Sequence, residues 1–285
     1  MKIKAELAPG KIALITGGSS GIGKAIACGL VERGMDVWLL AQHKEGLDAA
    51  RVEVESHRKN PAQKIYTYSV DVSQLDQVHT AINQVSTTSG TPDLLVNSAG
   101  VTHPGYVEKL DTHIFNWMME VNYFGTVYTI KEVLPAMLDR KSGYILNISS
   151  GSGILATFGY TAYAPSKFAV YGFSEALRQE IKLRGIGVSV LFPNDTDTPQ
   201  LTYENQFKPP ETFALNGAAG RNTPEEVARS AIQGVERGQY LIFTNLEGKL
   251  TFLLKRYAPG LLDLMMDQIL ASVRRKNNKI VQKEA

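Results

Sequence analysis

The sequence predicts an α/β fold, with one doubly wound parallel sheet that carries helices on both faces. Three observations support this prediction. Short apolar runs alternate along the chain with longer helix-forming segments. The runs are apolar throughout, which is typical of strands buried on both faces of a parallel sheet. A glycine-rich loop follows the first run and leads into a helix-forming stretch, as in a βα unit with a right-handed crossover.

The elements follow in order along the chain. The expected strands are the apolar runs at 11–15, 37–41, 65–70, 94–96, 144–148, 188–192 and 240–244. The expected helices are 22–31, 44–59, 74–88, 112–139, 162–184, 223–237 and 260–273. Asn60 and Pro61 stop the second helix, whereas Thr223 and Pro224 supply an N-cap and a first helical residue. In such a sheet the ligand site lies beyond the carboxyl ends of the strands.

The 285 residues are enough for one large domain or two small ones. Because no internal repeat, low-complexity tract or linker divides the chain, a single domain over 1–285 is expected. Residues 194–222 are polar and rich in proline and glycine, and they are expected to form a lid inserted after the sixth strand. Residues 246–285 are expected to form a C-terminal helical extension, with an apolar stripe at 260–273.

The composition is that of a soluble globular enzyme, with 44% hydrophobic and 20% charged residues. A formal net charge of +2 gives no reason to expect a nucleic-acid partner. The single cysteine, Cys28, excludes an intrachain disulfide and a zinc cluster of several thiolates, and no metal site is expected. Its apolar neighbours predict a buried structural thiol. Since no apolar stretch reaches the ~18 residues of a spanning helix, a cytoplasmic location is expected.

The glycine-rich loop at 16–23 is the first candidate site. It follows an expected strand and opens an expected helix, which is the context that a dinucleotide-binding loop requires. Glycines let the backbone approach a pyrophosphate, and the amides at the helix start can bind it. Taken alone, the loop is also consistent with an ordinary turn. The residues expected to contact the cofactor are Gly17, Ser19, Ser20, Gly21, Ile22 and Gly23.

Two further motifs stand at the ends of expected strands. Asp71 and Val72 follow the third strand, where a carboxylate can accept a hydrogen bond from an adenine amino group. Asn97, Ala99 and Gly100 belong to a short motif that ends the fourth strand, at the switch point of the sheet. Each motif alone is consistent with a simple loop. Together with the glycine loop, they predict a dinucleotide site.

The end of the second strand determines the choice of cofactor. An acidic residue there would bind the ribose diol of NAD, but the sequence has Gln42, His43 and Lys44. Together with Ser19, these residues favour a 2′-phosphate and therefore NADP(H). For Lys44, a solvated position at a helix start is nearly as good an interpretation.

Tyr163 and Lys167 form the candidate reaction centre. They are four residues apart at a helix start, so both side chains lie on one face. A nearby ammonium group is expected to lower the pKa of the phenol, which can then act as a general acid. Ser150 ends the fifth strand and can bind a substrate carbonyl oxygen. Asn122 can hold a water that links Lys167 to solvent, or it can simply kink its helix.

These residues, taken together and in this order, resemble the short-chain dehydrogenase/reductases. The resemblance covers residues 11 to about 199. It implies a single Rossmann-type domain, a homo-oligomer that is a dimer or tetramer, and a catalytic tetrad formed by Asn122, Ser150, Tyr163 and Lys167. It also implies cofactor contacts by Pro193, Thr196 and Thr198, and by Tyr163 and Lys167 themselves. One departure is Asn194, because the family usually has glycine after this proline.

Within that family, the stretches 158–163 and 193–212 resemble the 3-ketodihydrosphingosine reductase subfamily. The resemblance implies NADPH-dependent reduction of a lipid-like ketone, 3-ketosphinganine, to sphinganine. A long hydrocarbon tail requires an apolar groove, for which Phe207, Phe213 and Leu215 are candidates. Glu204 or Asp195 is available for the substrate ammonium. For each of these five residues taken individually, ordinary packing or solvation in the lid is the preferred interpretation.

The sequence is also consistent with other functions. The same mechanism serves a steroid, a retinoid, a sugar or a 3-oxoacyl thioester. A chain of another class, a regulator that senses NADP(H) without catalysis, would have less need of Tyr163 and Lys167 together. The apolar stripe and the basic residues up to 276 can rest on the cytoplasmic face of a membrane as a peripheral contact, but burial against protein is the preferred interpretation.

Overall fold

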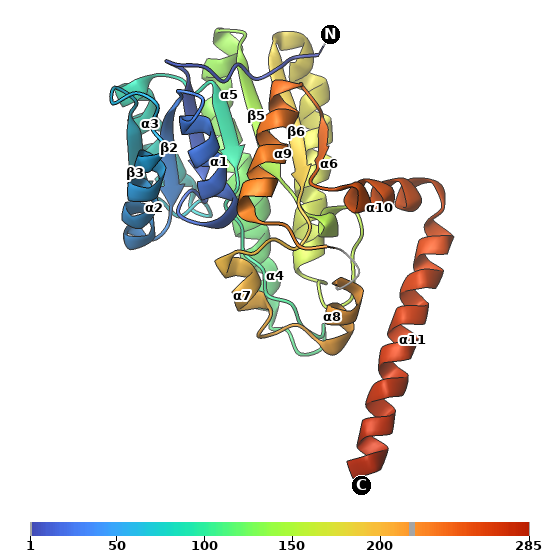
Figure 1. Ribbon diagram of the computed structural model, residues 1–285. Coiled ribbons are helices and arrows are strands. Elements are labelled where there is room, and N and C mark those ends of the chain that lie inside the picture. Colours follow the sequence, from blue (N-terminus) through green and yellow to red (C-terminus); the bar gives the residue numbers. More distant parts are fainter. Residues whose placement is uncertain (1, 217–219, 285) are drawn as a thin grey trace.

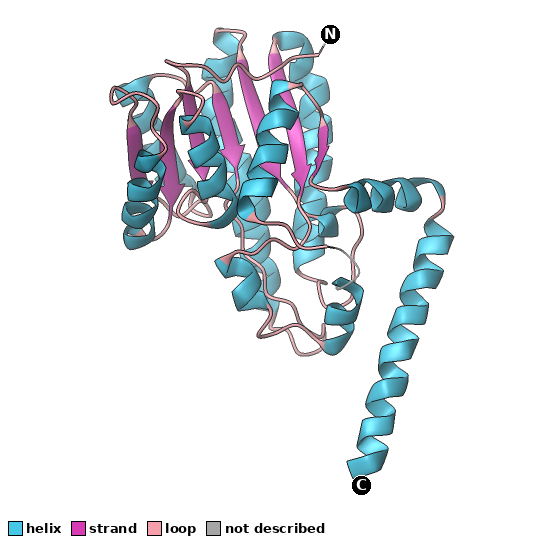
Figure 2. Cartoon of the chain, viewed as in Figure 1, coloured by secondary structure: helices cyan, strands magenta, loops and turns pink. Residues whose placement is uncertain are grey.

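A computed structural model describes residues 2–216 and 220–284, and the side chains only as far as residue 275. Within these residues the core is one parallel sheet of seven strands, in the order β3-β2-β1-β4-β5-β6-β7 (Figures 1 and 2). The strands are β1 (Ile12–Thr16), β2 (Asp36–Ala41), β3 (Ile65–Ser69), β4 (Leu94–Asn97), β5 (Gly143–Ile148), β6 (Ile186–Phe192) and β7 (Leu241–Phe243). The order reverses between β1 and β4, as a doubly wound sheet requires.

Helices cover both faces of the sheet, which confirms the predicted fold class (Figure 1). One face packs against α1 (Gly21–Val31), α2 (Lys44–Ser56) and α9 (Pro224–Glu236). The other packs against α3 (Leu75–Ser89), α5 (Gly125–Asp139) and α6 (Tyr163–Ile181). Successive residues of a strand point to opposite faces, so Ile15 belongs to the first layer and Leu14 to the second. Cys28 is buried in the first layer, where burial raises the pKa of its thiol to about 11.

The single helix expected at 112–139 is wrong in one respect. The chain forms α4 (Thr112–Met118), then a π-helical turn over Met119–Phe124, and only then α5. Asn122 lies in this turn, and its side chain binds both backbone groups of Val101. Such local π turns are frequent at functional sites. The prediction missed the turn because the residues on both sides of it are helical, and a helix-forming segment does not show where the hydrogen bonds change from i→i−4 to i→i−5.

The segment after β6 contains two short helices, α7 (Pro199–Glu204) and α8 (Pro210–Asn216). Residues 217–219 of the expected lid lie outside the described residues. After β7 the chain forms α10 (Leu246–Tyr257) and α11 (Pro259–Glu284), and α11 packs against α8 before it extends away from the sheet (Figure 1). Among the described helices, none combines the length and apolar character needed to cross a bilayer.

Candidate active site

A cavity of about 690 Å³ lies beyond the carboxyl ends of the strands, where the topology predicts the ligand site. Its wall begins at the glycine loop between β1 and α1 and passes the ends of β4, β5 and β6. It continues under α7 and α8 and ends against α10 and α11. Segments from the whole length of the chain therefore meet around one cavity.

The glycine loop forms one end of the cavity, and all six residues expected from it line the wall. Gly17 has φ +67°, and a Cβ there would lie 2.7 Å from the backbone nitrogen of Ala99. Gly21 also has a positive φ, of +52°. The backbone therefore passes where no side chain fits, and the helix start of α1 is left open toward the cavity. This cradle suits the pyrophosphate of a dinucleotide.

Four of the residues expected beside the adenosine line the same end of the cavity: Gln42, His43, Asp71 and Val72. Gln42 Nε2 donates a hydrogen bond of 3.2 Å to the Asp71 carboxylate, which links the ends of β2 and β3. Lys44 does not line the cavity. It is exposed at the first residue of α2, which is the position of a solvated helix-start residue. The expected contact of Lys44 with a phosphate therefore receives no support.

At the end of β4, Ala99 and Gly100 line the cavity as expected, but Asn97 does not. The Asn97 side chain is buried, donates to Asn147 Oδ1 at 2.8 Å and accepts from Thr129 Oγ1 at 2.6 Å. The Asn97 side chain therefore faces away from the cavity, and a contact of this residue with the cofactor stays a prediction. As the last residue of a strand, Asn97 points into the protein, where it joins β4 to β5 and α5.

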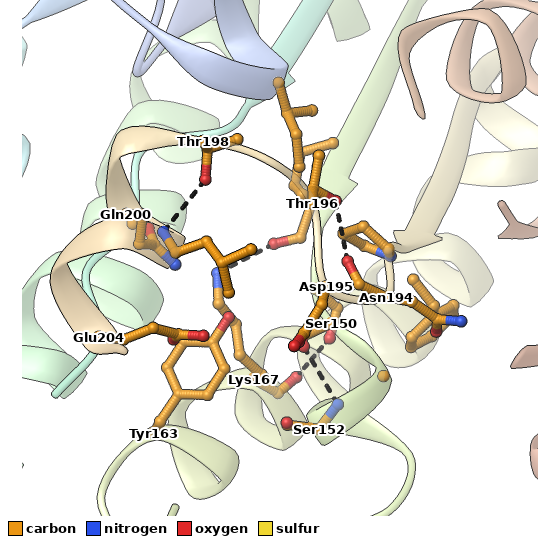
Figure 3. Close-up of a pocket in the computed structure, with 18 of the residues that line it drawn as sticks. Ser150, Ser152, Tyr163, Lys167, Asn194, Asp195, Thr196, Thr198, Gln200 and Glu204 are labelled. Atoms are coloured by element: carbon orange, nitrogen blue, oxygen red, sulfur yellow. Dashed lines mark hydrogen bonds between the residues drawn. The ribbon is translucent and has the colours of Figure 1, made fainter. Parts of the chain in front are cut away.

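Tyr163, Lys167 and Ser150 come together on the cavity wall (Figure 3). Lys167 Nζ lies 5.7 Å from the centre of the Tyr163 ring and donates to the Ile148 carbonyl at 3.3 Å. Ser150 follows β5, and its hydroxyl oxygen accepts a hydrogen bond from the Ser152 amide. The phenol and the ammonium group are thus close together, and both lie at the carboxyl edge of the sheet, as the glycine loop does.

Asn122 lies behind this centre rather than on the cavity wall. Its side chain is almost fully buried, accepts from the Val101 amide at 2.8 Å, and donates to the Val101 carbonyl and to Ser166 Oγ. Ser166 directly precedes Lys167, so Asn122 ties the loop after β4 to the start of α6. This geometry is that of a positioning residue.

Burial determines the ionisation of the centre. It raises the pKa of Tyr163, and the negative charge of Glu204 raises it further, while Ser150 and Gln200 lower it. Burial also lowers the pKa of Lys167 to about 8. The shift of Tyr163 is opposite to the one expected from Lys167, because loss of solvent disfavours the phenolate more than the neighbouring side chains favour it. The phenol therefore stays protonated, as a proton donor requires.

The residues expected after β6 line the cavity: Pro193, Thr196 and Thr198. Thr198 also caps α7, because its hydroxyl accepts from the Leu201 amide. Asn194, which departs from the family's glycine, donates to Asn245 Oδ1 at 3.1 Å. Since Asn245 is the N-cap of α10, this side chain links the root of the lid to the C-terminal helices.

The expected apolar groove is lined differently from the prediction. Leu215 lines the cavity, but Phe207 and Phe213 are 41% and 46% exposed and do not. Sequence reasoning missed the opposite wall, which α10 and α11 supply through Leu254, Leu262, Met265, Met266 and Ile269. The apolar stripe at 260–273 was the available signal. Its partner is distant in sequence, and so periodicity alone cannot identify it.

Comparison with known sequences identifies relatives of this chain. A sequence profile described as short chain dehydrogenase matches residues 11–209. A 3-ketodihydrosphingosine reductase from Bos taurus is 40% identical over 233 residues, which are 81% of this chain and 70% of that protein. A 3-dehydrosphinganine reductase from Danio rerio is 41% identical over 228 residues, or 80% of this chain and 69% of that protein. The residues matched by the profile, 11–209, include both the glycine loop and the reaction centre.

Solved structures share the fold. A short chain dehydrogenase/reductase from Burkholderia phymatum, in complex with NAD, has a TM-score of 0.79 at 23% identity, over 90% of this chain and 96% of that one. Levodione reductase has a TM-score of 0.76, also at 23% identity, over 86% and 98%. With the parallel sheet, the open glycine loop and the paired Tyr163 and Lys167, these similarities show that the chain is an oxidoreductase of the short-chain dehydrogenase/reductase family.

Proposed function

We propose that this enzyme uses NADPH to reduce a long-chain 3-keto amino alcohol, 3-ketosphinganine, to sphinganine. One observation carries the proposal: the cavity that holds Tyr163 continues into an apolar wall built by α8, α10 and α11. Relatives at 40% and 41% identity carry the names of enzymes for this reaction. A small polar ketone would not need such a wall.

The residues of the reaction centre suit reduction. Bound NADPH would supply the hydride to the keto carbon. The Tyr163 hydroxyl donates its proton to the ketone oxygen, and Ser150 donates a hydrogen bond to the same oxygen. The raised pKa of Tyr163 keeps this proton in place until the oxygen becomes basic. Lys167, with a pKa of about 8, carries a positive charge at neutral pH and stabilises the developing phenolate.

The apolar wall suits the hydrocarbon tail. Leu215 of α8 faces the cavity from the lid, and Leu262, Met266 and Ile269 face it from α11. Methionine side chains are flexible and adapt to the varied shapes of a saturated chain. Each buried methylene of the substrate contributes about 0.8 kcal/mol, so a long tail supplies much of the binding energy.

A preference for NADPH is part of the proposal. No carboxylate ends β2, where one would repel a 2′-phosphate. Ser19, Gln42 and His43 line this end of the cavity and offer hydrogen bonds to a phosphate.

The test is oxidation of NADPH by the purified full-length protein across a panel of ketones. We expect 3-ketosphinganine to have the highest kcat/KM, compared with a steroid, a retinoid, a sugar and a 3-oxoacyl thioester. Equal or better turnover of any of these four would overturn the substrate assignment. No turnover of any ketone would favour a non-catalytic, NADP(H)-sensing role instead.

We further propose that α10 and α11 contact the cytoplasmic face of a membrane peripherally. These helices expose several large apolar side chains, namely Leu246, Leu250, Leu253, Tyr257, Leu261 and Leu264. Lys255 and Arg256 lie among them, as basic residues do in helices that bind anionic lipid surfaces. The side chains of Lys276, Lys279 and Lys283 lie outside the described residues.

Sedimentation with vesicles tests this contact. We expect binding to vesicles that contain phosphatidylglycerol, and roughly 10-fold weaker binding when Leu261 and Leu264 are both replaced by Asp. Failure of the wild-type protein to bind, or equal binding of the double variant, would contradict the contact.

A further inference from the structure

A buried cluster of charged side chains forms the lid side of the cavity. Lys208 Nζ lies 2.7 Å from Glu204 Oε1 and 3.4 Å from Asp195 Oδ2. The side chains of Lys208, Glu204 and Asp195 are 2%, 8% and 26% exposed. One ammonium group therefore faces two carboxylates, and the cluster carries a formal charge of −1. A buried charge without a full counter-charge is unfavourable unless a further partner completes the site.

The cluster lies beside the reaction centre. Glu204 and Asp195 both line the cavity, and Figure 3 shows the Glu204 carboxylate next to the Tyr163 ring. The negative charge of Glu204 is the second largest cause of the raised pKa of Tyr163, after burial. The enzyme thus keeps an anion where it makes its own proton donor weaker, which a purely structural ion pair would not require.

Besides Lys208, uncharged side chains also hold Glu204 in place. The Tyr160 hydroxyl donates to Glu204 Oε1 at 3.3 Å, and Asn216 donates to the Tyr160 oxygen in turn. Burial raises the pKa of Glu204, whereas Lys208 lowers it and Asp195 raises it again. The Thr102 side chain also favours the charged form of Glu204. Its hydroxyl is buried and has no partner of standard hydrogen-bond geometry among the described residues.

We infer that Glu204 and Asp195 form a subsite for an ammonium group on the carbon next to the ketone. This inference rests on the proposed function, because it deepens the choice of substrate for the same cavity. In a 2-amino-3-ketone the two groups are on adjacent carbons, so a cation subsite must lie directly beside the proton donor. The carboxylate of Glu204 next to Tyr163 meets this requirement.

The subsite has a consequence for catalysis as well as for binding. The substrate ammonium adds one positive charge, which brings the formal charge of the cluster to zero. It also offsets the effect of Glu204 on Tyr163, so the phenol becomes a stronger acid when an amino ketone is in place. A ketone without the amino group leaves Tyr163 weakened. The enzyme is therefore expected to favour the amino ketone over the ketone without the amino group in kcat as well as in KM.

The test compares 3-ketosphinganine with the matching 1-hydroxy-3-ketone that lacks the amino group. We expect the wild-type enzyme to prefer the amino ketone by about 10- to 100-fold in kcat/KM, the range of a charge-assisted hydrogen bond. Glu204→Gln should reduce that ratio at least 10-fold, and Glu204→Asp should restore part of it. Asp195→Asn, the second variant, should reduce the ratio less, because Asp195 is more exposed.

Glu211→Gln is the matched control. Glu211 is another buried carboxylate of the lid, but it accepts from the Tyr106 hydroxyl and does not line the cavity. Its replacement should leave the ratio of the two substrates unchanged. Equal losses for both substrates in Glu204→Gln would overturn the subsite and leave a structural role in the lid.

Binding of the product separates failure of this inference from failure of the proposed function. Calorimetry with NADP⁺ and sphinganine requires no turnover, and Glu204→Gln should weaken sphinganine binding about 10-fold or more. If the wild type reduces both ketones equally well, the subsite is wrong while ketone reduction stands. If it reduces neither ketone and does not bind sphinganine, both proposals fail. Sphinganine binding that depends on Glu204 without any turnover would support the subsite alone.

Discussion

The two ends of the cavity are built in different ways. At the cofactor end, the wall comes from short loops at the ends of adjacent strands, and the critical groups are backbone positions such as Gly17 and Gly21. At the substrate end, the wall comes from α7, α8, α10 and α11, and the critical groups are side chains from distant parts of the sequence. The comparison suggests that the cofactor end tolerates almost no change in shape, whereas the substrate end can be altered one contact at a time.

The largest effect is expected at Tyr163, where the two ends meet. Tyr163→Phe removes the proton donor but keeps the ring that packs 5.6 Å from the ring of Tyr160. We expect kcat to fall by about 10²- to 10⁴-fold. Titration of NADPH fluorescence should show nearly unchanged cofactor binding. Retention of most of the activity would mean that another group donates the proton.

Gly17→Ala tests the rigidity of the cofactor end. The new Cβ would lie 2.7 Å from the Ala99 nitrogen, at a positive φ, so the backbone must shift. We expect about 1–3 kcal/mol of lost stability and up to about 100-fold weaker NADPH binding, measured by urea unfolding and fluorescence titration. The control is Gly172→Ala, where the added carbon meets nothing within 4 Å. If both variants behave alike, the close approach at Gly17 has no special role.

Lys167 lies where the two ends of the cavity meet, and its buried ammonium group makes the stability of the protein depend on pH. Its pKa is about 8 in the folded protein and near 10.5 when unfolded, so the unfolded chain binds more protons between these values. The free energy of unfolding should therefore gain from Lys167 as pH rises from 8 toward 10, by roughly 2–3 kcal/mol. Buried tyrosines with raised pKa values lose stability only above about pH 10. The urea unfolding midpoints of the wild type and of Lys167→Met should approach each other as pH rises from 8 to 10. A constant difference between the two midpoints would contradict this prediction.

The substrate end should respond contact by contact. Leu262→Ala shortens one side chain of the apolar wall and should raise the KM of a long-chain ketone by roughly 10-fold, with no change for a short-chain ketone. Gln268→Ala, at an exposed position of the same helix outside the wall, should change neither value. An equal rise for short and long ketones would place the tail elsewhere.

The same contrast explains what the sequence could and could not predict. The glycine loop and the pair of Tyr163 and Lys167 are local patterns, whose geometry follows from a strand end or a helical turn, and the structure brings them together. Asn97 belongs to an equally local motif, but the direction of one side chain at a strand end is not encoded by its neighbours. Phe207 was misjudged, and the place of Leu262 in the cavity wall was missed, for another reason: which apolar side chain meets the cavity depends on packing between elements far apart in the chain.

The smallest effect is expected on the preference for NADPH over NADH. It tests a side chain at the cofactor end, where the critical groups are otherwise backbone positions. Gln42 is an exposed side chain there, and it is held by its hydrogen bond to Asp71. Gln42→Asp would place a carboxylate beside the proposed site of the 2′-phosphate, at a cost of about 1 kcal/mol for two like charges 4 Å apart in water, or about 5-fold in affinity. The ratio of kcat/KM for NADPH over NADH should fall accordingly. Lys44→Ala should leave that ratio unchanged, because Lys44 lies outside the cavity wall. A larger effect of Lys44→Ala than of Gln42→Asp on this ratio would mean that side chains outside the cavity wall bind the 2′-phosphate. The rigid part of the cofactor end would then be limited to the glycine loop.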